Sequence, residues 1–292
     1  MNRVKTKTDI VYNEHTKKDI IISHISDLHF NINTKTKDLS KVTQELNKIK
    51  PDYIMITGDL IDIPSITNNK NKIKELLSFL SDIAKITKVL ISIGNHDILT
   101  DNDFKFFNKI NDLYNIYVLN DTSYQDEFIF VTGFTLPNDY YYNITGDESA
   151  EVLINYLDNN SKLIKNIPKN IPKVALIHSP IRLNEDSVLK KLHEYDLILS
   201  GHTHNGMVPD ILNFMFPKNM GIVSPRKGFF PEIAKGKIEK NIDNKLITVI
   251  INGAITKLSY RSGFPFRYLN ILYNKSANKI IIRRKRGIKY EN

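Results

Sequence analysis

The sequence predicts an α/β fold with two sheets and with helices on their outer faces, and two observations carry this prediction. In the first third of the chain, short apolar runs of strand length alternate with segments whose apolar residues recur at helical spacing. The second half continues the alternation less regularly, with no linker and no fixed-period repeat. We therefore expect residues 1–292 to form a single domain.

The first half begins with a segment of alternating apolar and polar residues, which is typical of an edge strand. The elements expected there are strands at 4–12, 19–26, 53–57 and 89–93 and helices at 39–49 and 73–83. Residues 19–26 are β-branched almost throughout, which indicates a buried central strand. Strands that alternate with helices imply a parallel sheet with right-handed crossovers.

The second half should supply the other sheet. The elements expected there are strands at 117–119, 128–134, 174–177, 197–199, 245–251, 268–272 and 279–282 and helices at 148–157 and 186–195. A long connection, residues 205–241, mixes apolar and basic side chains and is expected to be a loop-rich insertion over the functional site. Connections of this length in compact domains are usually functional.

Composition narrows the function classes. The apolar content of 41% is enough for a large core and argues against disorder. The absence of cysteine excludes disulfides and thiolate metal sites. A net charge of +9 favours anionic partners, although scattered lysines are mostly solvated surface. The sequence shows neither a signal peptide nor an apolar run of membrane-spanning length, so we expect a location in the cytoplasm or at the membrane periphery.

Polar motifs follow five of the expected strands. They are Asp27-Leu-His29, Gly58-Asp59, Gly94-Asn-His-Asp97, His178 and Gly201-His-Thr-His204. Ligands of open α/β sheets bind at the carboxyl ends of the strands, so motifs that are distant in sequence can converge there. The candidate ligands are three oxygen donors and four imidazoles, a set that suits Mn, Fe or Zn. Seven donors exceed one tetrahedral ion and suit two divalent ions that share a carboxylate.

This series of motifs resembles the calcineurin-like metallophosphoesterases from about Ile20 to His204. The resemblance implies an α/β sandwich that hydrolyses phosphoesters with two divalent metal ions. It also implies seven ligands: Asp27, His29 and His204 for the first ion, Asn95, His178 and His202 for the second, and Asp59 as the bridge between them.

The resemblance further implies a histidine beside the substrate. His96 would protonate the leaving oxygen or stabilise charge, and Asp62 would orient the His96 ring, with Asp97 as a second candidate. Three other histidines receive no such role. His24, in the middle of a strand, is expected to be a core histidine, and His15 and His193 are expected at the surface.

Two local features concern the substrate. The protein-phosphatase branch of the family has an arginine where this chain has Ile63, which argues against a phosphoprotein substrate. The segments 201–206 and 262–267 are similar to a bacterial membrane-associated branch that acts on UDP-diacylglucosamine and related phosphodiesters or pyrophosphates. We therefore expect a phosphodiester or pyrophosphate substrate, of a nucleotide-linked lipid or another membrane-associated molecule.

A further hypothesis from the sequence is that the connection 205–241 contacts an anionic membrane. Its apolar side chains would meet lipid, while Lys218, Arg226 and Lys227 would meet phosphate. The alternative is that its aromatic residues complete the core. The basic run 283–286 could add to such a surface, but solvated tail charges explain it as well.

Two other function classes remain open. A non-catalytic metal-binding scaffold would be expected to lose ligands, whereas this chain keeps all seven and His96. A nuclease or nucleotide phosphodiesterase is compatible with the same metals and with the basic charge. No basic-aromatic stretch indicates a strand-binding platform, so no specific nucleic acid is predicted. The sequence predicts no oligomeric state.

Overall fold

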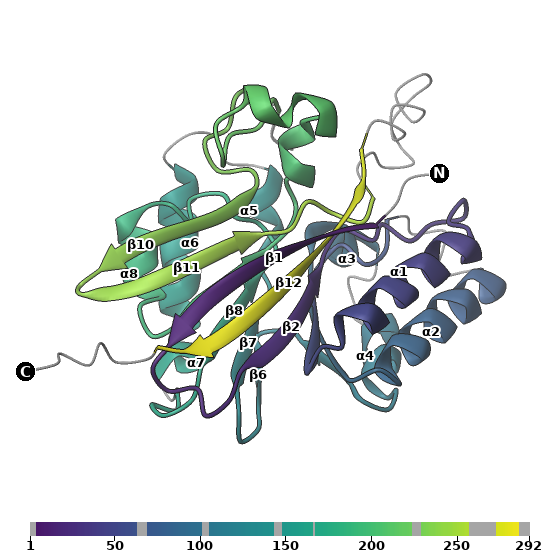
Figure 1. Cartoon of the computed structure of the whole chain (residues 1–292), viewed down its shortest axis with the longest axis horizontal. Coiled ribbons are helices and arrows are strands. Elements are labelled where there is room, and N and C mark those ends of the chain that lie inside the picture. Colours follow the sequence, from purple (N-terminus) through teal and green to yellow (C-terminus); the bar gives the residue numbers. More distant parts are fainter. Residues whose placement is uncertain are drawn as a thin grey trace, which may run out of the picture.

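The chain folds into two facing sheets with helices on the outer side of each (Figure 1). The computed structural model describes residues 4–62, 69–100, 105–142, 148–165, 167–223, 229–256 and 273–285. Within these ranges each sheet has six strands. The predicted α/β architecture with outer helices is therefore confirmed.

The first sheet has the strand order β1-β12-β2-β3-β4-β5. Its strands are β1 (Val4–Asn13), β12 (Lys275–Arg284), β2 (Ile20–Ile25), β3 (Tyr53–Thr57), β4 (Lys88–Ser92) and β5 (Ile116–Leu119). Strands β2 to β5 are parallel, as the alternation with helices predicted, and β1 lies at the edge. The helices of this half are α1 (Thr36–Ile49), α2 (Lys70–Ala84), α3 (Asn95–Thr100) and α4 (Lys105–Asn111).

The second sheet has the strand order β10-β11-β9-β8-β7-β6. Its strands are β10 (Gly236–Ile242), β11 (Lys245–Ile251), β9 (Leu197–Ser200), β8 (Lys173–Ile177), β7 (Phe130–Phe134) and β6 (Thr122–Gln125). Its helices are α5 (Asn138–Tyr142), α6 (Glu148–Asn159), α7 (Lys162–Lys165), α8 (Asp186–Lys191) and the 3₁₀ turns η2 (His204–Met207) and η3 (Asp210–Met215).

Three apolar clusters hold the four layers together. Along β3, Met55 points into the cluster between the sheets, whereas Ile54 and Ile56 point to the cluster under α1 and α2. This alternation is the ordinary period of a strand, so one strand can serve two clusters. The third cluster lies between the second sheet and helices α6 and α8. Because both faces of each sheet are covered, the central strands read as continuous apolar runs.

The structure corrects several expected elements. Residues 236–242, predicted as part of a loop-rich connection, form β10 and pair with β11 in an antiparallel hairpin. Asp243 and Asn244 make its two-residue turn, both at positive φ (48° and 66°), as a type I′ turn requires. Helix α8 ends at Lys191 instead of residue 195. The expected strand 268–272 lies outside the described residues.

In the described parts of the chain, we find no helix with the length and apolar character needed to cross a bilayer.

Candidate metal centre

The predicted site residues follow the carboxyl ends of neighbouring strands. Asp27, Asp59 and Asn95 come two or three residues after β2, β3 and β4, and His178 and His202 follow β8 and β9 in the other sheet. Five residues at these ends have positive φ: Asp27, His29, Asp59, His202 and His204. Non-glycine residues rarely adopt this conformation, and they concentrate at functional sites. The sharp turns aim the side chains back across the strand ends.

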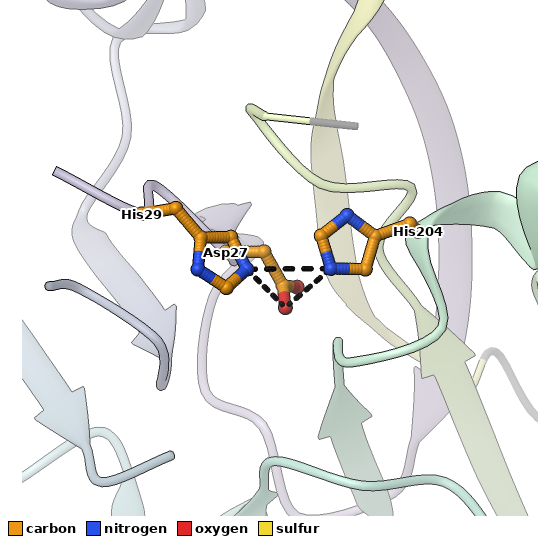
Figure 2. Close-up of side chains that lie close together, drawn as sticks. All are labelled: Asp27, His29 and His204. Carbon is orange, nitrogen blue, oxygen red and sulfur yellow. Dashed lines mark hydrogen bonds and ion pairs between the residues drawn. The ribbon is translucent and has the colours of Figure 1, made fainter. Parts of the chain in front are cut away.

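Asp27, His29 and His204 form a first group of converging donors (Figure 2). The His29 Nε2 and His204 Nε2 atoms are 3.3 Å apart. The Asp27 Oδ1 atom lies 3.7 Å from His29 Nε2 and 3.6 Å from His204 Nε2. The His204 Nδ1 atom is 2.7 Å from the Thr256 carbonyl oxygen, to which it can donate. That contact leaves His204 Nε2 as the nitrogen available to a ligand.

Asp59, His178 and His202 form a second group, in which all three residues are buried. The His178 Nε2 atom lies 3.2 Å from Asp59 Oδ2 and 3.2 Å from His202 Nδ1. The His178 Nδ1 atom, 2.7 Å from the Thr57 carbonyl oxygen, can only be the donor of that hydrogen bond. The His178 Nε2 atom is thereby directed into the group.

The Asp59 carboxylate lies between the two groups. Its Oδ2 atom is 3.7 Å from His29 Nε2, of the first group, as well as 3.2 Å from His178 Nε2. Its Oδ1 atom accepts the backbone N–H of His96 at 2.8 Å. Asn95, the seventh predicted ligand, is buried in the first turn of α3 directly before His96. The backbone therefore places Asn95 on the Asp59 side of the site.

The carboxylate beside the His96 ring belongs to Asp62. Its Oδ1 atom is 2.8 Å from His96 Nδ1 and 3.6 Å from His29 Nδ1. Asp97 points elsewhere, because its two oxygens accept the backbone N–H groups of Ile61 and Gly94 at 3.0 and 2.9 Å. Burial and the neighbouring charge of Asp59 raise the pKa of Asp97 to about 7. His96 has 22% of its side chain exposed and His204 15%, whereas Asp27, His29 and Asp59 have at most 2%, so the site opens at these two rings.

The electrostatics of the site suit a cation. Burial would raise the pKa of Asp59, but the charges of His178 and His96 hold it well below its usual value. Burial would lower the pKa of His29, but Asp27 and Asp62 raise it to about 10. Asp59 likewise raises the pKa of His178 to about 9 against the effect of burial. The carboxylates thus draw positive charge toward two groups whose donors are nitrogen and oxygen atoms, which fits borderline divalent ions.

Two glycines of the motifs are required by close approach. A Cβ atom at Gly201 would lie 1.7 Å from Ser26 Oγ and 2.5 Å from Asp27 Oδ2. A Cβ atom at Gly94 would lie 2.3 Å from Asp59 Oδ1. These positions therefore admit only glycine if both carboxylates are to keep their places.

Some contacts of the site could not be predicted from the sequence. Tyr141, on α5, is buried, with its ring centroid 5.3 Å from that of His202 and 6.2 Å from that of His178. Burial and the charge of Asp59 raise the pKa of Tyr141 well above its usual value, so it stays protonated. Nothing local in sequence marks this long-range contact. His24 is a buried core histidine 2.8 Å from Thr57 Oγ1, and burial lowers its pKa to about 3.

Comparison with known proteins gives the family. The model of the calcineurin-like phosphoesterases matches residues 20–206. The metallophosphoesterase Cj0846 of Campylobacter jejuni is 28% identical over 73% of this chain and 49% of its own length. The UDP-2,3-diacylglucosamine pyrophosphatase LpxG of Chlamydia trachomatis is 23% identical over 78% of this chain and 76% of its own. A dimetal phosphatase structure from Danio rerio aligns with 80% of this chain and 87% of its own, at a TM-score of 0.43 and 9% identity.

The chain spans about half the length of the Campylobacter relative. The matched region runs from the start of β2 past His204 and so contains all of the strand-end motifs. Because the family model covers well over half of the sequence, this chain belongs to the calcineurin-like phosphoesterase family.

Proposed function

We propose that this protein hydrolyses phosphoesters with two divalent metal ions. The observation that carries the proposal is the Asp59 carboxylate, whose Oδ2 atom is within 3.7 Å of ring nitrogens in both donor groups. In this proposal the seven ligands are Asp27, His29 and His204 for one ion, Asn95, His178 and His202 for the other, and Asp59 between them. Bound divalent ions, Mn, Fe or Zn, would supply Lewis acidity toward the phosphoryl group and an attacking water.

His96 is the proposed catalytic acid. Its Nδ1 atom is paired with Asp62, which leaves Nε2 as the nitrogen that can give a proton to the leaving oxygen. Its partial exposure at the mouth of the site is what contact with a substrate needs. Asp62 is a positioning residue, because its carboxylate lies 2.8 Å from His96 Nδ1 and holds the ring in place.

For the substrate we propose a phosphodiester or a pyrophosphate, of a nucleotide-linked lipid or another membrane-associated molecule. LpxG, a relative named as a UDP-2,3-diacylglucosamine pyrophosphatase, supports this class, as do Ile63 and the segments 201–206 and 262–267. A peripheral contact with an anionic membrane belongs to the same proposal. The bulky, amphiphilic character of such a substrate would require an open approach to His96 and His204.

A metal analysis and a substrate panel test the proposal. Protein loaded with Mn²⁺ should bind two ions per chain and hydrolyse bis-p-nitrophenyl phosphate or UDP-diacylglucosamine. Faster cleavage of single-stranded DNA would indicate a nuclease instead, and two bound ions without activity on any substrate would indicate a scaffold. Binding of only one ion, with activity retained, would contradict the dinuclear centre.

Asp59→Asn is the informative variant. Losing the shared charge should lower metal affinity by at least about 10–100-fold, because that is the typical cost of changing a residue that only supports a ligand. Asp82→Asn is the matched control, because Asp82 is half-exposed on α2 and pairs with Lys85 on the surface. If the Asp59→Asn protein retained both ions and full activity, the proposal that Asp59 is shared by two metal ions would be refuted.

A further inference from the structure

Five large apolar side chains lie exposed on the connection between η2 and β10. The set, called the apolar lip below, is Ile211 (75% exposed), Phe214 (85%), Met215 (64%), Phe229 (76%) and Phe230 (58%). Other exposed large apolar residues among the described ones are scattered along the chain, and they are Tyr12, Ile32, Leu99, Tyr114, Tyr117 and Leu246. Single exposed apolar residues are ordinary, but a group on one connection marks an interaction surface.

The residues of the apolar lip do not belong to the hydrophobic core. The same connection already contributes Val208, fully buried, and Ile233 to the interior. All five lip residues lie between Val208 and Ile233 in the sequence, and each has more than half of its surface exposed. Completion of the core, the alternative suggested by sequence, therefore accounts for Val208 and Ile233 but not for the apolar lip.

The backbone holds the lip residues in place. In a 3₁₀ helix residues i and i+3 eclipse, so Ile211 and Phe214 share one side of η3. Asp210, which begins η3, accepts the backbone N–H of Asn274 at 2.8 Å. On the other arm, Phe229 forms an antiparallel bridge with Val223, and the N–H of Phe230 donates to the Ile222 carbonyl at 2.9 Å. The lip is thus a preorganised surface.

The apolar lip is also fastened to the metal centre. The turn η2 begins at His204, and the carbonyl of Gly206, two residues on, accepts the N–H of Ile222 at 2.7 Å. The Thr203 hydroxyl donates to the Ala234 carbonyl at 2.7 Å, which ties the far end of the connection to the residue before His204. Any surface that the apolar lip contacts is therefore brought close to the open side of the site.

Charged residues of both signs lie near the apolar lip, with Asp210 at the start of η3, Glu232 exposed two residues after Phe230, and lysines beside them. Lys218 is exposed, and Lys5, with 63% of its side chain exposed, lies 3.8 Å from Asp210 at the start of η3. Lys235 passes beneath η3, with its Nζ atom 2.8 Å from Asn213 Oδ1 and 5.8 Å from the centroid of the Phe216 ring. The whole chain carries a net charge of +9. Apolar side chains beside lysines suit a surface that offers both acyl chains and anionic head groups.

We propose that the apolar lip docks this protein on an anionic bilayer, with the metal centre facing the membrane surface. The purpose of the docking rests on the proposed function, since an amphiphilic phosphoester would then reach the site without leaving the bilayer. The side chains of Phe214 and Phe229 enter the acyl boundary, while Lys218 and Lys5 stay among the head groups.

Vesicle sedimentation of the metal-free protein tests the docking without any assay of activity. The chain should bind vesicles of phosphatidylcholine with phosphatidylglycerol, bind phosphatidylcholine alone more weakly, and lose affinity as salt rises. The double variant Phe214→Ser, Phe229→Ser should bind at least about tenfold more weakly, since each side chain alone is worth roughly that factor when buried. Leu246→Ser, a change at a half-exposed residue of β11, is the matched control and should bind as the unaltered chain does.

Three results would overturn the docking. They are a failure of the unaltered chain to bind anionic vesicles, equal binding by the double variant, and a dimer in light scattering that the double variant disrupts while vesicles remain unbound. The last result would assign the apolar lip to contact between two copies. A protein that binds vesicles but neither metal nor substrate would refute the hydrolase proposal alone, so the two failures are distinguishable.

Discussion

At the residue scale, the pair of His96 and Asp62 is the part of the site with the most specific chemical prediction. The 2.8 Å contact fixes one ring nitrogen of His96, and its remaining exposure leaves the other accessible. His29 shares the same carboxylate at 3.6 Å, so Asp62 links the proposed acid to the proposed ligands. His96 is not itself one of the seven proposed ligands, so the effect of changing it can be separated from the effect of losing a ligand.

His96→Ala should lower kcat by about 10²–10⁴-fold and leave the metal content unchanged, because the proposed acid is lost but no ligand is. The loss should be smaller for substrates with an acidic leaving group such as p-nitrophenol, which needs no proton. Steady-state kinetics with a series of leaving groups checks both points. His193→Ala serves as the control, and an unchanged kcat in His96→Ala would exclude the proposed role.

Asp126 carries a second prediction at this scale, far from the site. Its carboxylate accepts the Tyr53 hydroxyl at 2.8 Å and the Lys88 ammonium at 2.9 Å. Burial would raise its pKa, but Lys88 and the other donors lower it from 3.8 to about 2. Because the unfolded chain takes up this proton first, Asp126 stabilises the fold above about pH 4, and the contribution is lost as the pH falls toward about 2.

Asp126→Asn should reduce the free energy of unfolding by about 1.5–3 kcal/mol near neutral pH, the range for hydrogen bonds to a charged group. The difference from the unaltered chain should shrink in acid, which denaturant titrations at about pH 6 and about pH 3 would measure. Glu127→Gln is the control, because Glu127 is the exposed neighbour. A difference that stays constant across this range would show that the charge of Asp126 contributes nothing.

At the scale of elements, the site depends on how closely strand ends approach one another. The end of β9 meets the end of β2 at Gly201, where no side chain separates it from Ser26 and Asp27. The N–H of His202 then donates to Asp27 Oδ2 at 2.9 Å. One strand from each sheet is thus joined at the proposed ligands themselves.

Gly201→Ala should break this approach, because its Cβ atom would lie 1.7 Å from Ser26 Oγ. Overpacking of this kind costs about 1–3 kcal/mol, and the displaced Asp27 should weaken metal binding as well. Thermal unfolding and metal titration measure the two effects. Ser200→Ala, one residue earlier in β9, removes an atom instead of adding one and should alter metal binding little. Equal metal affinity in Gly201→Ala would refute the steric argument.

At the scale of the whole molecule, the proposed ligands come from both sheets. Asp27, His29 and Asp59 follow strands of the first sheet, whereas His178, His202 and His204 follow strands of the second. Away from these ligands, the two sheets pack against each other through the apolar cluster that includes Met55 and Leu199. A bound metal ion would therefore connect the two halves of the fold in addition to serving the reaction.

Metal ions should accordingly stabilise the whole chain against unfolding. By mass action, a single site at 100 times its dissociation constant adds about 2.7 kcal/mol, so Mn²⁺ should raise Tm and EDTA should reverse the effect. Calorimetry of the unaltered chain and of His178→Ala would measure it, with a smaller rise expected for the variant. A Tm that does not respond to Mn²⁺, Zn²⁺ or Fe²⁺ would speak against a metal link between the sheets.

Local pattern was enough to predict much of the fold. Apolar or β-branched residues recur every second position along β1, and apolar residues recur at helical spacing along α1 and α2. These patterns involve only residues that are close in sequence, so they can be recognised without the structure. The strand 236–242 was missed because its burial is mixed, with only Ile242 buried, and because most of it fell within the long connection predicted over residues 205–241. Four short helices that the sequence did not predict, α3, α4, α5 and α7, have seven residues or fewer and are too brief to show a clear period.

By itself the sequence determined which residues stand at strand ends. The apolar pattern of a strand and the polar residues that follow it are local properties of the sequence. Only the tertiary structure decided that Asp62 and not Asp97 meets His96, that Tyr141 covers His202, and that the apolar lip faces outward. These outcomes depend on contacts between residues far apart in the chain, and burial and direction at such contacts are fixed only when the two sheets pack.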